Sequence, residues 1–142
     1  MNSYPVVNFH FRVEWGGANI GFSKVSGLKA EHEILEYRTG ADKEYSAKKI
    51  PGLKKFNNLI LKRGVLEQDN DVFLWFNSIG ISTERRDVVI SLLNHEHEPT
   101  IVWKIKNAWP VSLKFSQLNA IKSEILIESL ELAHEGYIVE RV

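Results

Sequence analysis

Residues 9–15 read Phe-His-Phe-Arg-Val-Glu-Trp, and this stretch decides the fold class of the chain. Its large apolar residues alternate with polar ones, and successive side chains of a β-strand point to opposite faces of a sheet. The pattern therefore predicts a strand with one buried face. Gly16-Gly17 follows and permits a tight reversal, because glycine adopts the positive φ that hairpin turns need. Ile20-Gly21-Phe22 then starts a predicted return strand, so the chain is expected to begin with a β-hairpin.

Further short strands are predicted along the rest of the chain, each bounded by polar turns or glycine. They are expected at residues 31–38, 58–63, 87–94, 101–108 and 124–134. The stretch from Trp109-Pro110 to Lys122 is expected to connect the last two.

One segment has helical periodicity instead. Residues 69–71, Asp-Asn-Asp, can cap a helix start, and Gly80 can end it. The apolar residues between them recur at helical spacing, namely Val72, Trp75, Phe76 and Ile79. About seven strands and one helix, without strand–helix alternation, predict an antiparallel two-sheet β-sandwich or barrel with one flanking helix.

The composition fits a single domain covering residues 1–142. Lys plus Arg and Asp plus Glu both number 18, so no net charge draws the chain to nucleic acid or to a membrane. The absence of cysteine excludes disulfides, thiolate zinc sites and a cysteine nucleophile. The N-terminal residues lack the basic start and apolar stretch of a signal peptide, so we expect synthesis in the cytoplasm.

Residues Thr39 to Phe56 break the strand pattern and are rich in lysine, glycine and turn residues, which predicts a long loop. Loops of this length in compact domains are usually functional or disordered. Four apolar residues are spread through this one, namely Tyr45, Ile50, Leu53 and Phe56. They favour a loop that docks on another surface.

Candidate chemistry is sparse. Residues 94–98, Asn-His-Glu-His-Glu, place two histidines on one side of a strand, but no third ligand is close in sequence, so a solvated hairpin end is favoured over a metal site. Neither a Gly-x-Ser-x-Gly motif nor a Walker-type phosphate loop is present. We therefore predict no catalytic, cofactor-binding or metal-binding residues.

Several ordered segments together resemble the tail tube proteins of T-even-type contractile phages and of related extracellular contractile injection systems. The likeness covers nearly the whole chain. Its segments are residues 11–14, 21–28, 36–38, 49–53, 61–64, 73–75, 107–110 and 131–136.

The resemblance implies a structural protein that forms hexameric rings, stacked so that their inner sheets join into one continuous barrel around a lumen. It implies a sheath protein, a baseplate and a terminator as partners, an effector protein or DNA as cargo, and no cofactor, no enzymatic activity and no membrane binding by the subunit. The particle would be a virion tail or an injection machine released from the cell. The 39–56 loop would then contact a neighbouring subunit through Tyr45, Ile50, Pro51, Gly52, Leu53 and Phe56. The alternative is a monomeric β-sandwich binding module that uses this loop to grip a ligand.

A tube that passes cargo needs a wetted wall. In the strand around residues 101–108, Ile101, Trp103 and Ile105 share one face and are assigned to the core. Lys104 and Lys106 share the opposite face and are assigned to the lumen, with Glu33 and Glu36 as candidate carboxylates interleaved from an adjacent strand. Solvation of the two lysines on the outer wall is the alternative.

Overall fold

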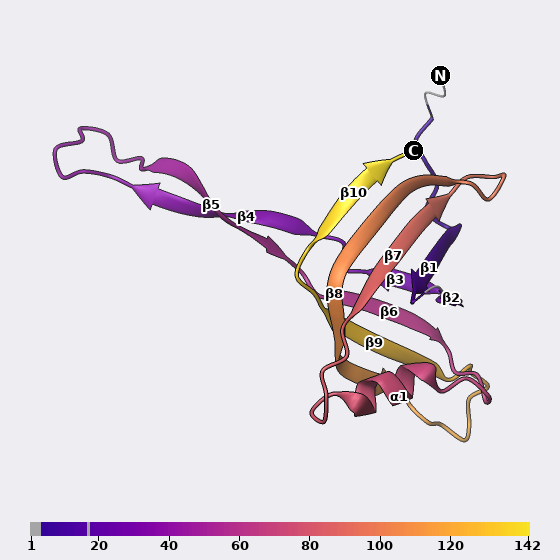
Figure 1. The fold of residues 1–142 in the computed structure, drawn as a ribbon. Coiled ribbons are helices and arrows are strands. Elements are labelled where there is room, and N and C mark those ends of the chain that lie inside the picture. The colour runs from indigo at the N-terminus through magenta and orange to yellow at the C-terminus, as the bar shows by residue number, and fades with distance from the viewer. Residues whose placement is uncertain (1–3, 17) are drawn as a thin grey trace.

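The computed structural model describes residues 4–16 and 18–142, and most of these residues form antiparallel strands folded over one apolar core (Figure 1). One short helix, α1 (Asp71–Ser78), covers an end of the fold. The strands are β1 (Phe11–Trp15), β2 (Ala18–Ile20), β3 (Lys24–Ser26), β4 (Ala30–Tyr37), β5 (Lys48–Phe56), β6 (Leu59–Gly64), β7 (Arg86–Leu93), β8 (Pro99–Phe115), β9 (Ile127–Ala133) and β10 (Tyr137–Arg141).

The long strand β8 joins the two layers of the fold. Eight strands are linked in a sheet with the order β2-β1-β7-β8-β9-β6-β3, in which β10 also pairs with β8. The first part of β8 pairs with β7 and β10, whereas its last part, from Trp109 to Phe115, pairs with β9. The sheet therefore turns over on itself along β8 without closing into a barrel. This architecture confirms the prediction of a mostly β, antiparallel fold with one helix.

The turn of β8 is built at Asn107. Lys106 and Asn107 together face Asp87 of β7, which makes a β-bulge, and Asn107 has a positive φ of 51°. Asparagine tolerates this left-handed conformation better than most residues, and a bulge bends its strand. The Asp87 carboxylate accepts the Asn107 N–H at 3.0 Å, and the Asn107 side chain donates to Glu135. These bonds fix the point at which β8 leaves one layer for the other.

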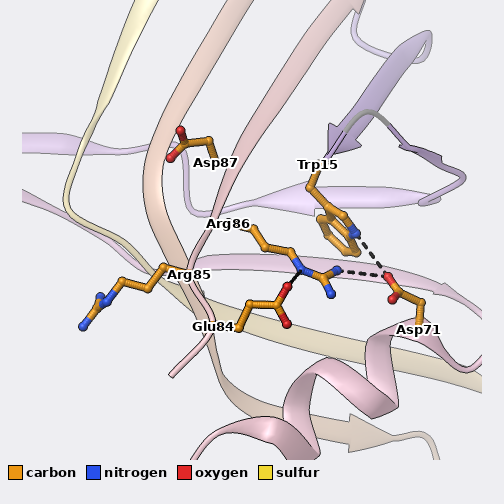
Figure 2. Close-up of a pocket in the computed structure, with 7 residues that line it drawn as sticks. Trp15, Asp71, Glu84, Arg85, Arg86 and Asp87 are labelled. Atoms are coloured by element: carbon orange, nitrogen blue, oxygen red, sulfur yellow. Dashed lines mark hydrogen bonds and ion pairs between the residues drawn. The ribbon is translucent and has the colours of Figure 1, made fainter. Parts of the chain in front are cut away.

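The core lies between the two layers and is closed at one end by α1. Trp75 of the helix is buried against Trp15 of β1, with their ring centroids 5.1 Å apart. The Arg86 guanidinium lies 4.4 Å from the centroid of the Trp75 ring. It also forms ion pairs with Asp71 and Glu84 (Figure 2). The helix is thus held by aromatic packing and by one arginine that reaches its first turn. The predicted helix is confirmed, with Val72 and Trp75 as its buried residues.

The prediction of a long loop over Thr39 to Phe56 is wrong for its second half. Residues Lys48–Phe56 form β5, which pairs with β4, and only residues 38–47 connect the two strands. The glycine, proline and lysines resemble a turn in composition, but pairing with a distant strand outweighs local propensity. Pro51 is tolerated because β5 pairs on only one side within the described chain.

Four further strands differ from the sequence prediction. β3 and β10 were not expected, because one has only three residues and the other follows Gly136 directly after β9. β8 also continues through the predicted connection at Trp109-Pro110, since the partner strand β9 satisfies its backbone as far as Phe115. The return strand of the first hairpin starts at Ala18, and Gly17 lies outside the described residues. Within the described ranges, no helix is long and apolar enough to span a membrane.

A buried ion pair crosses the second layer. Arg63 of β6 and Glu128 of β9 lie opposite each other, are 3% and 6% exposed, and approach to 2.5 Å. Arg63 also contacts Asp69 at 2.9 Å. The pKa of Asp69 is lowered, first by the hydrogen bond from the Asp71 N–H and then by that from Arg63. Charges withdrawn from water in this way must stay paired, since an uncompensated buried charge is costly.

We predict that Glu128→Ala lowers the free energy of unfolding by about 3–5 kcal/mol, because it leaves the buried Arg63 guanidinium without its main partner. Denaturant-induced unfolding followed by circular dichroism measures this change. The double variant Arg63→Met/Glu128→Leu is the control and should lose less, because it removes both charges and refills the space. A single variant as stable as the double variant would contradict this role for the pair.

Candidate assembly site

The hairpin of β4 and β5 projects from the rest of the fold (Figure 1). The two strands pair from Ala30 opposite Phe56 to Tyr37 opposite Lys48, with one register shift between His32 and Ile34. Neither strand pairs with a third one among the described residues. A two-stranded hairpin without such support is only marginally stable in water, so this one needs a further surface to pack on.

The projecting hairpin carries exposed apolar side chains on both of its strands. Leu35 and Ile50 lie opposite each other and are 52% and 47% exposed, and Leu53 is 74% exposed. We define the hairpin surface as Ile34, Leu35, Tyr37, Tyr45, Ile50 and Leu53, all of which are exposed. Ile34 and Leu35 are successive residues of β4 and therefore point to opposite faces, so both faces of the hairpin expose apolar groups that a partner could cover.

The structure distributes the residues predicted for the 39–56 segment over the tip, the shaft and the root of the hairpin. Tyr45 lies in the tip and is 97% exposed. Ile50, Pro51 and Leu53 lie on β5, with Pro51 opposite Ile34. Gly52 lies at a register shift where an added Cβ would stand 3.1 Å from the Cβ of Glu33, so this position favours glycine.

Phe56 differs from the others, because it packs within its own chain at the hairpin root. Its ring meets Tyr137 edge-on at a centroid distance of 4.9 Å and lies over Gly136. Gly136 has a φ of 121°, and an added Cβ there would lie 3.0 Å from the Phe56 ring. His134 accepts the Gly136 N–H at Nδ1 and therefore donates from Nε2 to the Asn57 carbonyl at 2.8 Å. This cluster fixes the hairpin to the start of β10.

The backbone at the start of β4, the other strand of the hairpin, also lies close to a neighbouring segment. Gly27 precedes β4 and has a φ of 92°, and an added Cβ there would lie 2.1 Å from the carbonyl oxygen of Asn58. No other residue fits against that backbone without moving it. The chain therefore enters and leaves the hairpin through fixed backbone contacts, which set the direction in which the hairpin surface points.

The predicted lumen residues lie on two separate parts of the structure. Ile105 is buried and Trp103 packs against the core, so Lys104 lies on the outer face of its layer. Lys104 forms an ion pair with Glu140, in which its Nζ lies 3.1 Å from Oε2. Glu140 belongs to β10, a strand that the sequence does not predict.

Glu33 and Glu36 do not lie beside these lysines in the subunit. Both belong to β4, whose only strand partner in the described chain is β5. Glu33 pairs with Lys55 at 2.5 Å, and Glu36 lies opposite Lys49. Within one copy of the chain, these carboxylates therefore do not interleave with Lys104 and Lys106.

Residues missed from the sequence complete the hairpin surface, namely Ile34, Leu35 and Tyr37 of β4. A signal for the β4–β5 pairing was present, because three glutamates precede a segment that contains four lysines. Two of the resulting oppositely charged pairs lie directly across the hairpin, Glu31 with Lys55 and Glu36 with Lys49.

The candidate metal segment forms the turn between β7 and β8. The Asn94 side chain accepts the backbone N–H groups of Glu96 and Glu98, and His97 has a positive φ of 60°. This confirms the favoured interpretation as a hairpin end. Within residues 4–16 and 18–142, no three His, Cys, Asp or Glu side chains gather as a metal site would require.

A family model and several solved structures are similar to this chain. The model of the T4-like virus tail tube protein gp19 family matches residues 7–138. No curated protein sequence matches the chain. Among solved structures, the chain is similar to one in the sheath-tube complex of PVC, an extracellular contractile injection system in the extended state, with 32% identity and a TM-score of 0.90 over 99% of this chain and 94% of that chain.

Two further solved structures are similar. A chain of the baseplate of the anti-feeding prophage AFP shares 27% identity, with a TM-score of 0.90 over 99% of this chain and 98% of that chain. Hcp1 from Flavobacterium johnsoniae shares 12% identity and a TM-score of 0.58 over 93% and 95% of the two chains, which shows a common fold. The family match covers almost the entire sequence, and the chain therefore belongs to the T4-like virus tail tube protein gp19 family.

Proposed function

We propose that this protein is a structural, non-enzymatic subunit of the inner tube of a contractile phage tail or a phage-tail-like injection system. In this role it forms hexameric rings that stack into a conduit for cargo. The family match over residues 7–138 carries this proposal. The partners follow from the similar proteins, which are found in a sheath-tube complex, a baseplate and a sheath/tube terminator, so we expect sheath, baseplate and terminator proteins around this tube as well.

The open sheet supports assembly on physical grounds. β2 and β3 end the strand order, so the sheet has edges whose backbone groups can pair with another chain. Exposed edges invite uncontrolled aggregation unless they are covered, and pairing of edges around a closed ring covers all of them. Polymerisation in a ring therefore satisfies groups that the monomer leaves in water.

The hairpin surface is the proposed contact with a neighbouring subunit. It lies far from the core of its own chain, and its root is fixed by the contacts of Gly27 and Gly136. A projecting element and a receiving surface elsewhere on the same molecule form a head-to-tail contact, which generates rings or filaments. Burial of its six apolar side chains would stabilise the assembled state while leaving the subunit fold unchanged.

We predict that Ile50→Asp/Leu53→Asp folds normally but does not form stacked rings. Both side chains are exposed in the subunit, so the change in the free energy of unfolding should stay within about 0.5 kcal/mol. In an assembled contact, by contrast, two unpaired carboxylates would be buried, which is strongly unfavourable. Negative-stain electron microscopy and thermal unfolding measure the two effects.

Ile81→Asp is the matched control, because Ile81 is 93% exposed and lies after α1, away from the hairpin. It should assemble like the unchanged protein. Stacked tubes from the double Asp variant would contradict the proposed contact. Unfolding of that variant would also contradict it, since Ile50 and Leu53 would then belong to the core of the subunit.

For the lumen we propose that Lys104 and Lys106 face the channel. We predict that the variant Lys104→Glu/Lys106→Glu still assembles but retains a different cargo. The opposite face of the strand is apolar, and both lysines are exposed in the subunit. Reversal of two charges per subunit changes the sign of a band repeated around every ring. Mass spectrometry and nucleic-acid staining of purified particles measure the cargo.

The control variant is Lys122→Glu, in the loop before β9, which should leave the cargo unchanged. Unchanged cargo in the double variant would rule out the lumen assignment.

A further inference from the structure

Three lysines form a line across the outer face of the second layer. Lys24 of β3 lies opposite Lys62 of β6, Lys62 lies opposite Ser129 of β9, and Ser129 lies opposite Lys114 of β8. We call these four residues the lysine row. The row runs perpendicular to the strands, and its lysines are exposed or partly exposed.

The lysine row carries positive charge that the subunit does not neutralise. Among the described residues, none of its lysines forms an ion pair, whereas Lys104 pairs with Glu140 and Lys55 pairs with Glu33. Like charges directly opposite each other on neighbouring strands destabilise a sheet. The pairing of Lys24 with Lys62 is therefore unfavourable in the isolated subunit and would be relieved by an anionic partner.

The surroundings of the row suit carboxylates. Two adjoining shallow hollows of about 400 and 240 Å³ lie on this face and share Lys62, Lys114 and Ser129. Three serines and two isoleucines make up most of the remaining lining, and a serine hydroxyl can donate a hydrogen bond to an anionic oxygen. The one carboxylate there, Glu131, accepts a hydrogen bond from the Asn58 side chain at 2.9 Å.

The lining of these hollows favours a protein partner over nucleic acid. No aromatic ring lines either of them, so bases would have no surface on which to stack. The chain as a whole is neutral, so it lacks the long-range attraction that phosphate backbones require. The Glu131 carboxylate would also repel a continuous line of phosphates, whereas a protein segment can place a neutral side chain beside it.

The spacing of the row points to an acidic helix. Neighbouring strands lie about 4.8 Å apart. Counted from Lys24, Lys62 is therefore one strand spacing away and Lys114 is three strand spacings away. Successive turns of an α-helix rise about 5.4 Å, which brings carboxylates on one helix face to nearly the same spacing. We propose that the lysine row is a docking surface for an α-helix of a partner protein. This helix carries glutamate or aspartate along one face and lies across the strands of this sheet.

This inference does not depend on tube formation, so it can be tested on the purified full-length chain. The probe is a helical peptide with glutamates on one face, labelled for fluorescence anisotropy. The comparison peptide has the same composition with its glutamates spread around the helix. The one-faced peptide should bind more tightly, and its affinity should fall as salt is added, because exposed ion pairs are screened.

Two variants at the three lysine positions distinguish the effect of lost charge on peptide binding from a structural effect of the substitutions. Lys24→Gln/Lys62→Gln/Lys114→Gln should weaken binding about tenfold, the sum of three exposed ion pairs, while Lys24→Arg/Lys62→Arg/Lys114→Arg should stay within about twofold of the unchanged protein. Both variants should unfold at the same temperature as the unchanged protein or above it.

Three results would overturn the proposal. Equal affinity of the Gln variant and the unchanged protein would show that the row does not bind the peptide. Equal affinity of the two peptides would exclude a helical partner. Tighter binding of a single-stranded oligonucleotide of equal charge, lost in the Gln variant, would assign the surface to nucleic acid. Because tube formation is scored separately by electron microscopy, none of these results bears on the proposed function.

Discussion

The fold depends on one covalent constraint, the continuity of β8 through both layers. Its 17 residues pair with β7 and β10 on one side of the bend and with β9 beyond it. The bend therefore has to be built into the strand, and Asn107 builds it with a positive φ and bonds to Asp87 and Glu135. The core, the covering helix and the two open edges of the sheet all follow from this turn, because it brings the two layers face to face without closing them.

What the fold leaves unsatisfied explains how it can assemble. The subunit has a complete core, with Trp15, Trp75 and the paired charges of Arg63 all buried, so further apolar surface is not needed for folding. Yet the hairpin surface stays in water, and its direction is fixed at the root by Gly27, Gly136 and the ring of Phe56. Docking on a neighbouring copy would supply the further surface that this two-stranded hairpin needs, which favours assembly between subunits whose cores are already formed.

The sequence predicts the parts of the structure that depend on local pattern. The helical spacing of Val72 and Trp75 and the alternation around Val13 specify buried side chains, but the predicted strand begins too early, because Phe9 lies before β1 and is 63% exposed. The sequence does not predict the parts of the structure that depend on pairing between distant segments. β5 forms only because it pairs with β4, and Lys104 is paired with Glu140 of β10, a strand that the pattern does not indicate. The contact residues named for the 39–56 segment remain a prediction, and the sequence could not separate Phe56 from them, because only the structure brings Gly136 beneath its ring.

Cryo-electron microscopy of the purified protein shows whether this chain is a tube subunit. We expect hexameric rings or stacked tubes with an open channel, in which the β4–β5 hairpin contacts a neighbouring copy. Images should be recorded at concentrations well above the micromolar range and again with a baseplate-like nucleus present. Strictly monomeric particles under both conditions would show that the chain is not a tube subunit, and rings in which the hairpin extends freely into solvent would rule out the proposed contact.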